Sequence, residues 1–411
     1  MKKARKDMRL LLIVDSYIYK SKDGRYWSKG ITDLNFFKRY LNVFEELTIA
    51  SRVKYLDDLD EKEFLNITDE KIQMIDIPFV RTSKEYLINY FKIRKMIKST
   101  SKKCDCIIYR LPSILSYIAY LTCKKNKKIY GVEVVADPED AYADKKILKT
   151  VLKSILKKIV YRANGASYVT ENALQKKYPS HVRRKPDLNS DNYFETFYSS
   201  IELKKEFFGQ PKNYSKKEQY IIAHTANISN SMVKGQDILI KSVGELVKKG
   251  FDIKIKFIGD SEIKDKYLEI ARKCGIESRI SFTGLLSKKE QIRKELINSD
   301  IYVLPTKSEG LPRSIIEAMA VGLPCVSTPV GGIPELLPKE LMIEPDDYKK
   351  FAETIANLIN NPSKLEELSK NNIEIAKQYM DERLTKKRND FYNKLKKITI
   401  NNNKSMKKVI K

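Results

Sequence analysis

Cysteines are few in this sequence, and none of them fits a metal-binding or disulfide pattern. The 411 residues include five cysteines, at positions 104, 106, 123, 274 and 325. No two of them are separated by two residues, and Cys104 and Cys106 would point to opposite faces of an extended strand. We therefore expect neither a structural metal nor a disulfide framework.

A long apolar run is also missing. A membrane-spanning helix needs roughly 20 apolar residues, whereas 32% of this sequence is charged and no run of that length occurs. The N-terminal apolar run, Leu10–Val14, is too short for a signal peptide and is followed by Asp15. We expect it to form the first strand of a cytoplasmic protein that is not integral to a membrane.

Acidic residues are in short supply. The sequence has 53 Asp and Glu against 79 Lys and Arg, which gives a net charge of +26. This excess fits a nucleic-acid binder, an anionic membrane surface or anionic nucleotide substrates, and it also fits a lysine-rich composition without functional meaning. Since the sequence has no zinc finger, no ribonucleoprotein motif and no interleaving of aromatic and basic residues, we expect no nucleic-acid partner.

Short apolar runs alternate with helical patterns along two parts of the chain. This alternation predicts an α/β fold with two doubly wound, Rossmann-like domains, and the length of the chain agrees with more than one domain. We expect a first domain at 1–200, a linker at 201–218, a second domain at 219–380, and a C-terminal helix with a basic tail at 381–411.

The most informative stretch is 308–320, with the sequence SEGLPRSIIEAMA. It follows an apolar run at 301–305 that is typical of a buried parallel strand. Pro312 suits the first position of a helix, where a missing N–H costs nothing. The free N–H groups near Arg313 and Ser314 would then form an anion site. The apolar residues of this helix should face the core: Ile315, Ile316, Met319 and Ala320.

Two carboxylates accompany this helix start. Glu309 lies in the loop before the helix, and Glu317 lies within it, on the side of Arg313 and Ser314. With a diphosphate at the helix start, Glu317 could bind a ribose diol and Glu309 a second polyhydroxylated group. A nucleotide-sugar is such a ligand. The alternative is an ordinary surface helix with two solvated glutamates.

These motifs together resemble a known family. The E-x7-E spacing, the GLP at 310–312, the EAMA at 317–320 and the GLPCVSTPVGGIPELL at 322–337 resemble the donor site of retaining GT-B glycosyltransferases of family 4. The resemblance is good from about Tyr220 to Leu337 and partial before that. It implies two Rossmann-like domains facing across a cleft, and transfer of a sugar from a nucleoside-diphosphate sugar to a glycan or lipid-linked acceptor in bacterial surface-polysaccharide synthesis.

The resemblance also implies roles for single residues. Glu309, Lys234 and Arg313 would act on the donor sugar and the leaving diphosphate, with no metal required. Asn227 stands where the family usually has a diphosphate-binding arginine, and Arg313 is the expected substitute. The remaining donor-binding residues would be Glu317, Gly310, Leu311, Ser314, Gly284 and Leu285, the last two beside the nucleobase.

The first domain offers three further candidates. Gly30 belongs to a polar stretch, Tyr17–Thr32, that we expect to be a loop, and it would either contact the donor phosphate or form a simple turn. Glu133 and Asp137 lie near a strand end where the family often places a histidine over the donor sugar. For both carboxylates, a helix cap or a solvated loop position is an equally good interpretation.

The segment 145–162 combines lysines with apolar residues at helical spacing. It predicts an amphipathic helix that docks on an anionic membrane with a lipid-linked acceptor in reach. The alternative is a domain helix whose apolar face packs on a sheet while its lysines face water. The protein would accordingly lie in the cytoplasm or at the inner face of the cell membrane.

The sequence-based hypothesis is therefore a retaining glycosyltransferase, and two alternatives stay open. One is a non-catalytic nucleotide- or sugar-binding partner subunit with the same fold, because the usual arginine and histidine are missing. The other is a soluble metabolic glucosyltransferase. Turnover of a nucleotide-sugar donor would exclude the non-catalytic alternative.

Overall fold

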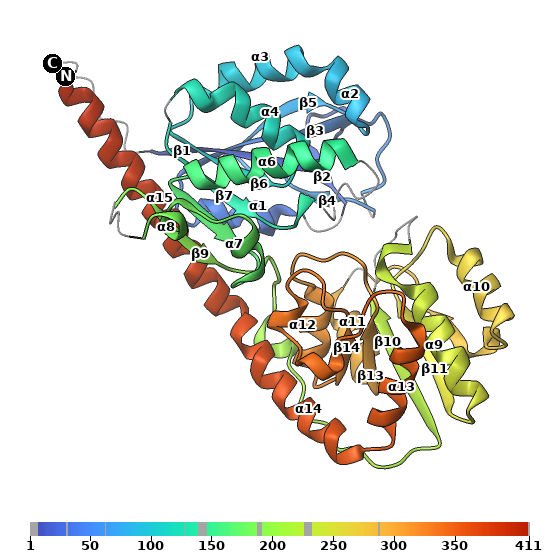
Figure 1. Ribbon diagram of the computed structural model, residues 1–411. Coiled ribbons are helices and arrows are strands. Elements are labelled where there is room, and N and C mark those ends of the chain that lie inside the picture. The colour runs from blue at the N-terminus through green and yellow to red at the C-terminus, as the bar shows by residue number, and fades with distance from the viewer. Residues whose placement is uncertain are drawn as a thin grey trace. The chain divides into compact units, whose positions relative to one another are not determined.

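The structure is a computed structural model that describes residues 7–29, 32–61, 63–126, 128–138, 146–186, 191–225, 232–286 and 288–409. The chain divides into two compact units, which Figure 1 shows in ribbon form. The first unit takes the chain up to Tyr198 and again from Thr385 onward, and the second comprises Ser199–Leu384. The C-terminal helix therefore begins in the second unit and continues in the first.

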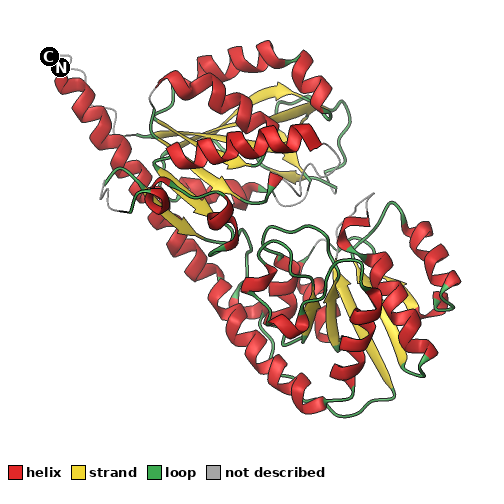
Figure 2. Ribbon diagram, in the orientation of Figure 1, coloured by secondary structure: helices red, strands yellow, loops and turns green. Residues whose placement is uncertain are grey.

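A parallel sheet forms the centre of the first unit (Figure 2). Its parallel strands pair in the order β5–β3–β1–β6–β7–β8–β9, and β2 and β4 add antiparallel pairs beside the end of β1. The strands are β1 Arg9–Lys20, β2 Tyr26–Ser28, β3 Glu46–Tyr55, β4 Leu65–Asn66, β5 Ile72–Pro78, β6 Cys106–Leu111, β7 Tyr130–Val134, β8 Gly165–Tyr168 and β9 Phe194–Phe197.

Helices cover this sheet, and α4 packs against both α3 and α6. The long helix α15 lies against β7, where a Cβ added at Gly131 would come within 3.1 Å of Phe391 and Leu395. The helices of this unit are α1 Leu34–Leu41, α2 Ser83–Ile88, α3 Tyr90–Ser101, α4 Ile114–Cys123, α6 Lys146–Arg162, α7 Ala173–Lys177, α8 His181–Arg184 and, from Thr385 on, α15 Asp381–Val409.

The first strand is longer than the sequence predicted. β1 continues to Lys20 after an irregularity between Ile13 and Tyr17, and β2 pairs with its end. The prediction of a loop over 17–32 was therefore wrong for 17–20 and 26–28. Asp15 does not end the strand, because aromatic and β-branched residues follow it and favour extended backbone.

The second unit has a sheet of parallel strands in the order β12–β11–β10–β13–β14. The strands are β10 Gln219–Thr225, β11 Asp252–Ile258, β12 Ile280–Phe282, β13 Ile301–Leu304 and β14 Cys325–Ser327. In this unit α9 packs against α10 and α13, and α12 packs against α14. The helices are α9 Gln236–Lys248, α10 Lys264–Lys273, α11 Lys289–Ile297, α12 Arg313–Ala320, α13 Tyr348–Ile359 and α14 Pro362–Ala376.

Residues 201–218, which the composition indicated as a linker, are bonded to the second unit. The Gly209 amide donates to the Ala320 carbonyl at 2.9 Å. The Tyr214 hydroxyl donates to the Asp300 carbonyl at 2.8 Å. This irregular segment therefore contacts the end of α12 and the residue before β13.

The basic helix α6 packs its apolar side into the first unit. Among its described side chains, Leu152, Leu156, Ile159 and Val160 are at most 5% exposed, while Val151 is 49% exposed. The residues before Lys146, including Lys145 of the predicted segment, lie outside the described part. No helix in that part is long and apolar enough to cross a membrane.

Candidate functional site

A lysine and a glutamate meet at the carboxyl ends of β10 and β13. The short 3-10 turn Met232–Lys234 precedes Gly235, where an added Cβ would lie 2.0 Å from the carbonyl oxygen of Pro305, the residue after β13. Gly235 has a φ of 76°, which glycine adopts without strain. This close approach brings Lys234 Nζ to 2.5 Å from Glu309 Oε1.

Two consecutive glycines, Gly331 and Gly332, hold the backbone of Glu309 and Gly310. A Cβ added at Gly331, whose φ is 58°, would lie 1.9 Å from the Glu309 carbonyl oxygen. The Gly332 amide donates to the Gly310 carbonyl at 2.6 Å. The loop between β13 and α12 is thus fixed against the segment after β14. The sequence showed these glycines only as part of the family-like string, and their role in supporting Glu309 comes from the structure.

Helix α12 begins one residue later than predicted, with Pro312 as the residue before it. The apolar residues predicted for the core are buried, and Leu311 is only 8% exposed. Ser314 is half-buried beside Tyr302; burial raises the pKa of that phenol, and the hydrogen bond with Ser314 opposes the shift. Gly310 and Ser314 therefore border the first turn of the helix, where backbone N–H groups lack intrahelical partners.

Glu317 differs from Glu309 in its surroundings. Glu317 is half-buried. Burial raises the pKa of its carboxyl, while the positive charges of Arg313 and Lys289 oppose this shift. Within the described residues, no hydrogen bond or ion pair engages the Glu317 carboxylate, whereas Glu309 is paired with Lys234. Glu317 is thus the carboxylate that is open to a ligand's hydroxyl groups.

Gly284 and Leu285 lie after β12, at the same edge of the sheet. Gly284 has a φ of 72° and bridges to Gly259 after the neighbouring strand. The Thr283 hydroxyl accepts from the Gly259 amide at 3.1 Å and fixes this turn. Leu285 is 64% exposed, so a large apolar side chain of this turn is mostly accessible to solvent.

The candidates of the first domain lie in the other unit. Asp137 is 2% exposed and accepts hydrogen bonds from Lys177 and the Tyr178 hydroxyl. Gly30 and Asn227 lie outside the described residues. The candidates that the structure does bring together are Lys234, Glu309, Gly310, Leu311, Arg313, Ser314 and Glu317.

Glu133 lies in a buried cluster of side chains, whereas the sequence suggested a contact to the donor sugar, a helix cap or a solvated loop position. It is 3% exposed, and Tyr198 and Tyr392 donate to one carboxylate oxygen at 3.0 and 2.9 Å. Tyr40 and Arg110 donate to the other oxygen, both at 2.8 Å. The carboxylate is therefore neither a helix cap nor a solvated group, and its hydrogen-bonding positions are occupied by the unit's own side chains.

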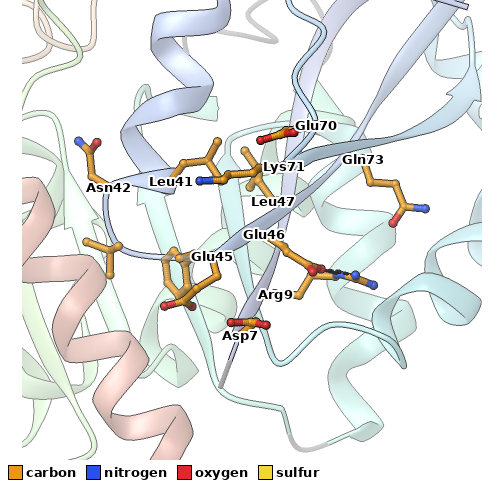
Figure 3. A pocket seen from close by; sticks show the side chains of 12 residues that line it. Asp7, Arg9, Leu41, Asn42, Glu45, Glu46, Leu47, Glu70, Lys71 and Gln73 are labelled. Atoms are coloured by element: carbon orange, nitrogen blue, oxygen red, sulfur yellow. Dashed lines mark hydrogen bonds and ion pairs between the residues drawn. The ribbon is translucent and has the colours of Figure 1, made fainter. Parts of the chain in front are cut away.

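A hollow lies in the first unit, at the amino ends of β1, β3 and β5 (Figure 3). Its volume of about 790 Å³ would admit a small molecule. Ligands of doubly wound sheets bind at the opposite, carboxyl edge. The Arg9 side chain in this hollow is already bonded to Glu46. We therefore do not count it as part of the site. Within the described residues, no group of histidines, cysteines and carboxylates is suited to hold a metal ion.

His224, at the end of β10, gives a prediction for pH dependence. It is fully buried, and its Nδ1 lies 2.9 Å from the Val303 carbonyl oxygen. Burial lowers its pKa from 6.5 to about 4, the bond to Val303 opposes the shift, and the charge of Lys234 adds to it. Because the unfolded chain takes up the proton first, stability should fall as the pH drops from 6.5 toward 4.

At about pH 5 this loss should amount to about 2 kcal/mol of the free energy of unfolding. His224→Asn retains an amide that can reach Val303 but does not titrate, so the variant should lack this part of the pH dependence. Urea unfolding of both proteins at neutral and mildly acidic pH measures it, and the comparison cancels the other titrating groups. Identical pH dependence in the two proteins would contradict the assignment.

Comparisons with known proteins identify the family. Residues 219–361 match the family described as Glycosyl transferases group 1. Over 404 residues the sequence is 30% identical to Protein CapJ of Staphylococcus aureus, which covers 94% of this chain and 98% of that protein. The chain belongs to the group 1 glycosyltransferases. The prediction of a glycosyltransferase enzyme is thereby confirmed. A second similar protein is N-acetyl-alpha-D-glucosaminyl L-malate synthase of Bacillus anthracis, with 27% identity over 38% of this chain and 40% of that protein.

Comparison with solved structures identifies the fold of this glycosyltransferase. Sucrose-phosphate synthase of Thermosynechococcus elongatus superposes with a TM-score of 0.68 at 15% identity, covering 94% of this chain and 99% of that one. Anabaena HepE in complex with UDP-glucose superposes with a TM-score of 0.64 at 14% identity, covering 95% and 100%. At this identity the likeness shows the fold, which is GT-B with two Rossmann-like domains, as the sequence predicted.

Proposed function

We propose that this group 1 glycosyltransferase is a retaining enzyme that uses a nucleoside-diphosphate sugar and transfers the sugar to a glycan or lipid-linked acceptor in bacterial surface-polysaccharide synthesis. The observation that carries the proposal is the contact between Lys234 and Glu309 beside the first turn of α12, with Glu317 unpaired on the same helix. The cation and the anion-binding helix start suit the diphosphate of such a donor, and the two carboxylates suit the hydroxyl groups of its ribose and its transferred sugar.

Each group has a chemical task in this proposal. Cleavage of the anomeric C–O bond leaves negative charge on the diphosphate, and Lys234, Arg313 and the first turn of α12 would stabilise that charge without a metal. Asn227 would donate a hydrogen bond to the same group. Glu317 would bind the ribose hydroxyls. The donor sugar would be oriented by Glu309.

The remaining donor contacts are proposed from position. Gly284 and Leu285 would contact the base, with the exposed Leu285 side chain against its face. Gly310, Leu311 and Ser314 would border the phosphates at the helix start. The solved complex of Anabaena HepE contains UDP-glucose, and a fold relative is described as a lipopolysaccharide outer core galactosyltransferase, which supports a nucleotide-sugar donor and a surface-glycan acceptor. A cytoplasmic location agrees with such a donor.

The experiment is a screen of UDP-, GDP-, ADP- and CMP-sugars by thermal shift and by slow release of free nucleotide, on wild type and Glu317→Ala. Binding of one base class, with release, is the expected result for the wild type. Loss of a charge-assisted hydrogen bond should weaken binding in the variant about 10- to 100-fold. The matched control is Glu353→Ala, which removes an exposed glutamate from α13.

The other outcomes are equally informative. Binding without release, even with candidate acceptors present, would contradict catalysis and favour a non-catalytic sugar-binding subunit. Efficient transfer to a small soluble sugar, with none to glycans, would favour the metabolic alternative. Equal binding by wild type and Glu317→Ala would contradict the role assigned to Glu317.

A further inference from the structure

Three apolar side chains at the junction of α2 and α3 are unusually exposed. Leu87 is 75% exposed, Ile88 71% and Phe91 78%, and the next most exposed large apolar side chain in the described part of the chain, Tyr55, is at 65%. The three lie within five residues of sequence. Contiguous exposed apolar side chains of this kind mark a contact surface rather than chance exposure. We call Leu87, Ile88 and Phe91 the apolar triad.

The exposure of the apolar triad follows from how its helices are anchored. The side chain of Tyr86 is buried, and its hydroxyl donates to Asp15 at 2.7 Å. Ile93 and Ile97 are fully buried and fix α3. Asn89 ends α2 and precedes α3, so the triad lies at the junction of two helices that are each held by buried side chains. The triad therefore points outward because the opposite faces of both helices are packed.

Basic residues dominate the segment of sequence that contains the apolar triad. The only acid between Phe79 and Lys103 is Glu85, whose carboxylate accepts from the Arg81 amide and the Thr82 hydroxyl. The exposed basic side chains of the same segment are Arg81, Lys84, Lys92, Lys95, Lys98, Lys102 and Lys103. Exposed apolar side chains flanked in sequence by basic residues are typical of helices that lie at the surface of anionic membranes.

We infer that the apolar triad inserts into the surface of an anionic lipid bilayer, with the lysines of the same segment on the lipid headgroups. Charge complementarity favours an anionic bilayer as the partner, because the segment is strongly basic and such a bilayer offers both negative headgroups and an apolar interior. Three side chains on two short helices are too small a surface for a stable protein interface, which buries about 800 Å² per partner. Binding to a bilayer instead grows with the buried apolar area and with the attraction to anionic lipids, so a small apolar surface contributes together with the lysines.

This inference moves the membrane contact away from the segment that the sequence indicated. Among the side chains of α6 that the structure describes, Val151 is the one large apolar side chain that is exposed, whereas the apolar triad offers three that are more exposed. The inference is independent of the donor site, since the apolar triad and the donor residues belong to different units. A failure of either proposal leaves the other standing.

The test is vesicle flotation of the full chain with phosphatidylcholine alone and with added phosphatidylglycerol. We expect the wild type to bind the anionic vesicles and to bind less at high salt, because headgroup attraction is screened. The triple variant Leu87→Ser/Ile88→Ser/Phe91→Ser should lower the partition coefficient by about 100-fold or more. Its thermal unfolding midpoint is measured alongside to show that it is folded.

Two further variants sharpen the test. Val151→Ser alters the exposed apolar residue of α6 and should leave vesicle binding unchanged. Phe91→Trp places an indole in the apolar triad, and brominated acyl chains should quench its fluorescence. The protein's one natural tryptophan, Trp27, is 3% exposed and should not be quenched, so it serves as an internal reference.

Several results would overturn the inference. Wild-type protein that ignores anionic vesicles would do so, as would a triple variant that binds them as well as the wild type. Loss of binding in Val151→Ser alone would return the contact to α6. A triple variant that instead changes the sedimentation of the lipid-free protein would show that the apolar triad joins two copies of the chain.

Discussion

Replacement of Lys234 by methionine is expected to lower kcat of donor turnover by about 100- to 1,000-fold, the range found when one charge-stabilising donor is removed. Lys234 Nζ is 2.5 Å from Glu309 Oε1 in the structure, and in the proposed reaction it faces the leaving diphosphate. Negative charge grows on that group as the bond breaks. The loss should therefore affect kcat more than KM, because the interaction strengthens in the transition state.

The matched control for this variant is Lys248→Met, at the other end of α9. Lys248 is an exposed lysine that pairs with Glu245, so the substitution makes the same change of charge away from the site. Release of the nucleoside diphosphate, measured for both variants with the donor found in the screen, gives the comparison. A Lys234→Met enzyme with wild-type kcat would mean that other groups stabilise the leaving diphosphate.

The local part of the site was predictable from the sequence. The strand at 301–304, the loop and helix α12 follow from apolar periodicity, and Pro312 marks the helix start. Such signals come from neighbours in the chain, and the same holds for the α/β alternation that predicted the fold. For this reason the predicted start of α12 differs from the observed start by only one residue.

Contacts between distant segments were not predictable. The bond from Lys234 to Glu309 depends on Gly235 lying against Pro305, and the support of Glu309 depends on Gly331. A glycine in a sequence shows that a close approach is allowed, but not which segment approaches. The arrangement of the site therefore depends on contacts between distant segments, which the apolar periodicity of the sequence does not predict.

Glu133 illustrates the same limit at longer range. Its partner Tyr392 is 259 positions away in the chain, on helix α15. A carboxylate near a strand end suggested a ligand contact, a cap or a solvated loop, since each of these is decided locally. The C-terminal helix supplies one of the three tyrosine hydroxyls around the carboxylate, and the other two come from Tyr40 of α1 and from Tyr198 after β9.

Glu133→Ala should accordingly be among the most destabilising substitutions in the first unit. It would leave the largely buried Arg110 without its counter-ion, a change that costs about 3–5 kcal/mol of the free energy of unfolding. It would also remove the acceptor for three tyrosine hydroxyls, which lie 65, 93 and 259 positions away in the chain. Urea unfolding of wild type and variant at neutral pH, followed by circular dichroism, measures the loss.

Two comparisons separate the charge from the hydrogen bonds. Tyr392→Phe removes one hydroxyl from the Glu133 carboxylate and should cost about 1.5–3 kcal/mol, the range for a bond to a charged group. The double variant Glu133→Gln/Arg110→Met removes both charges, so it should be more stable than Glu133→Ala, because no buried charge is left unpaired. If the double variant were instead the less stable one, the ion pair would not be the main contribution. Shape complementarity around α15 would then be the stronger explanation for the docking of this helix.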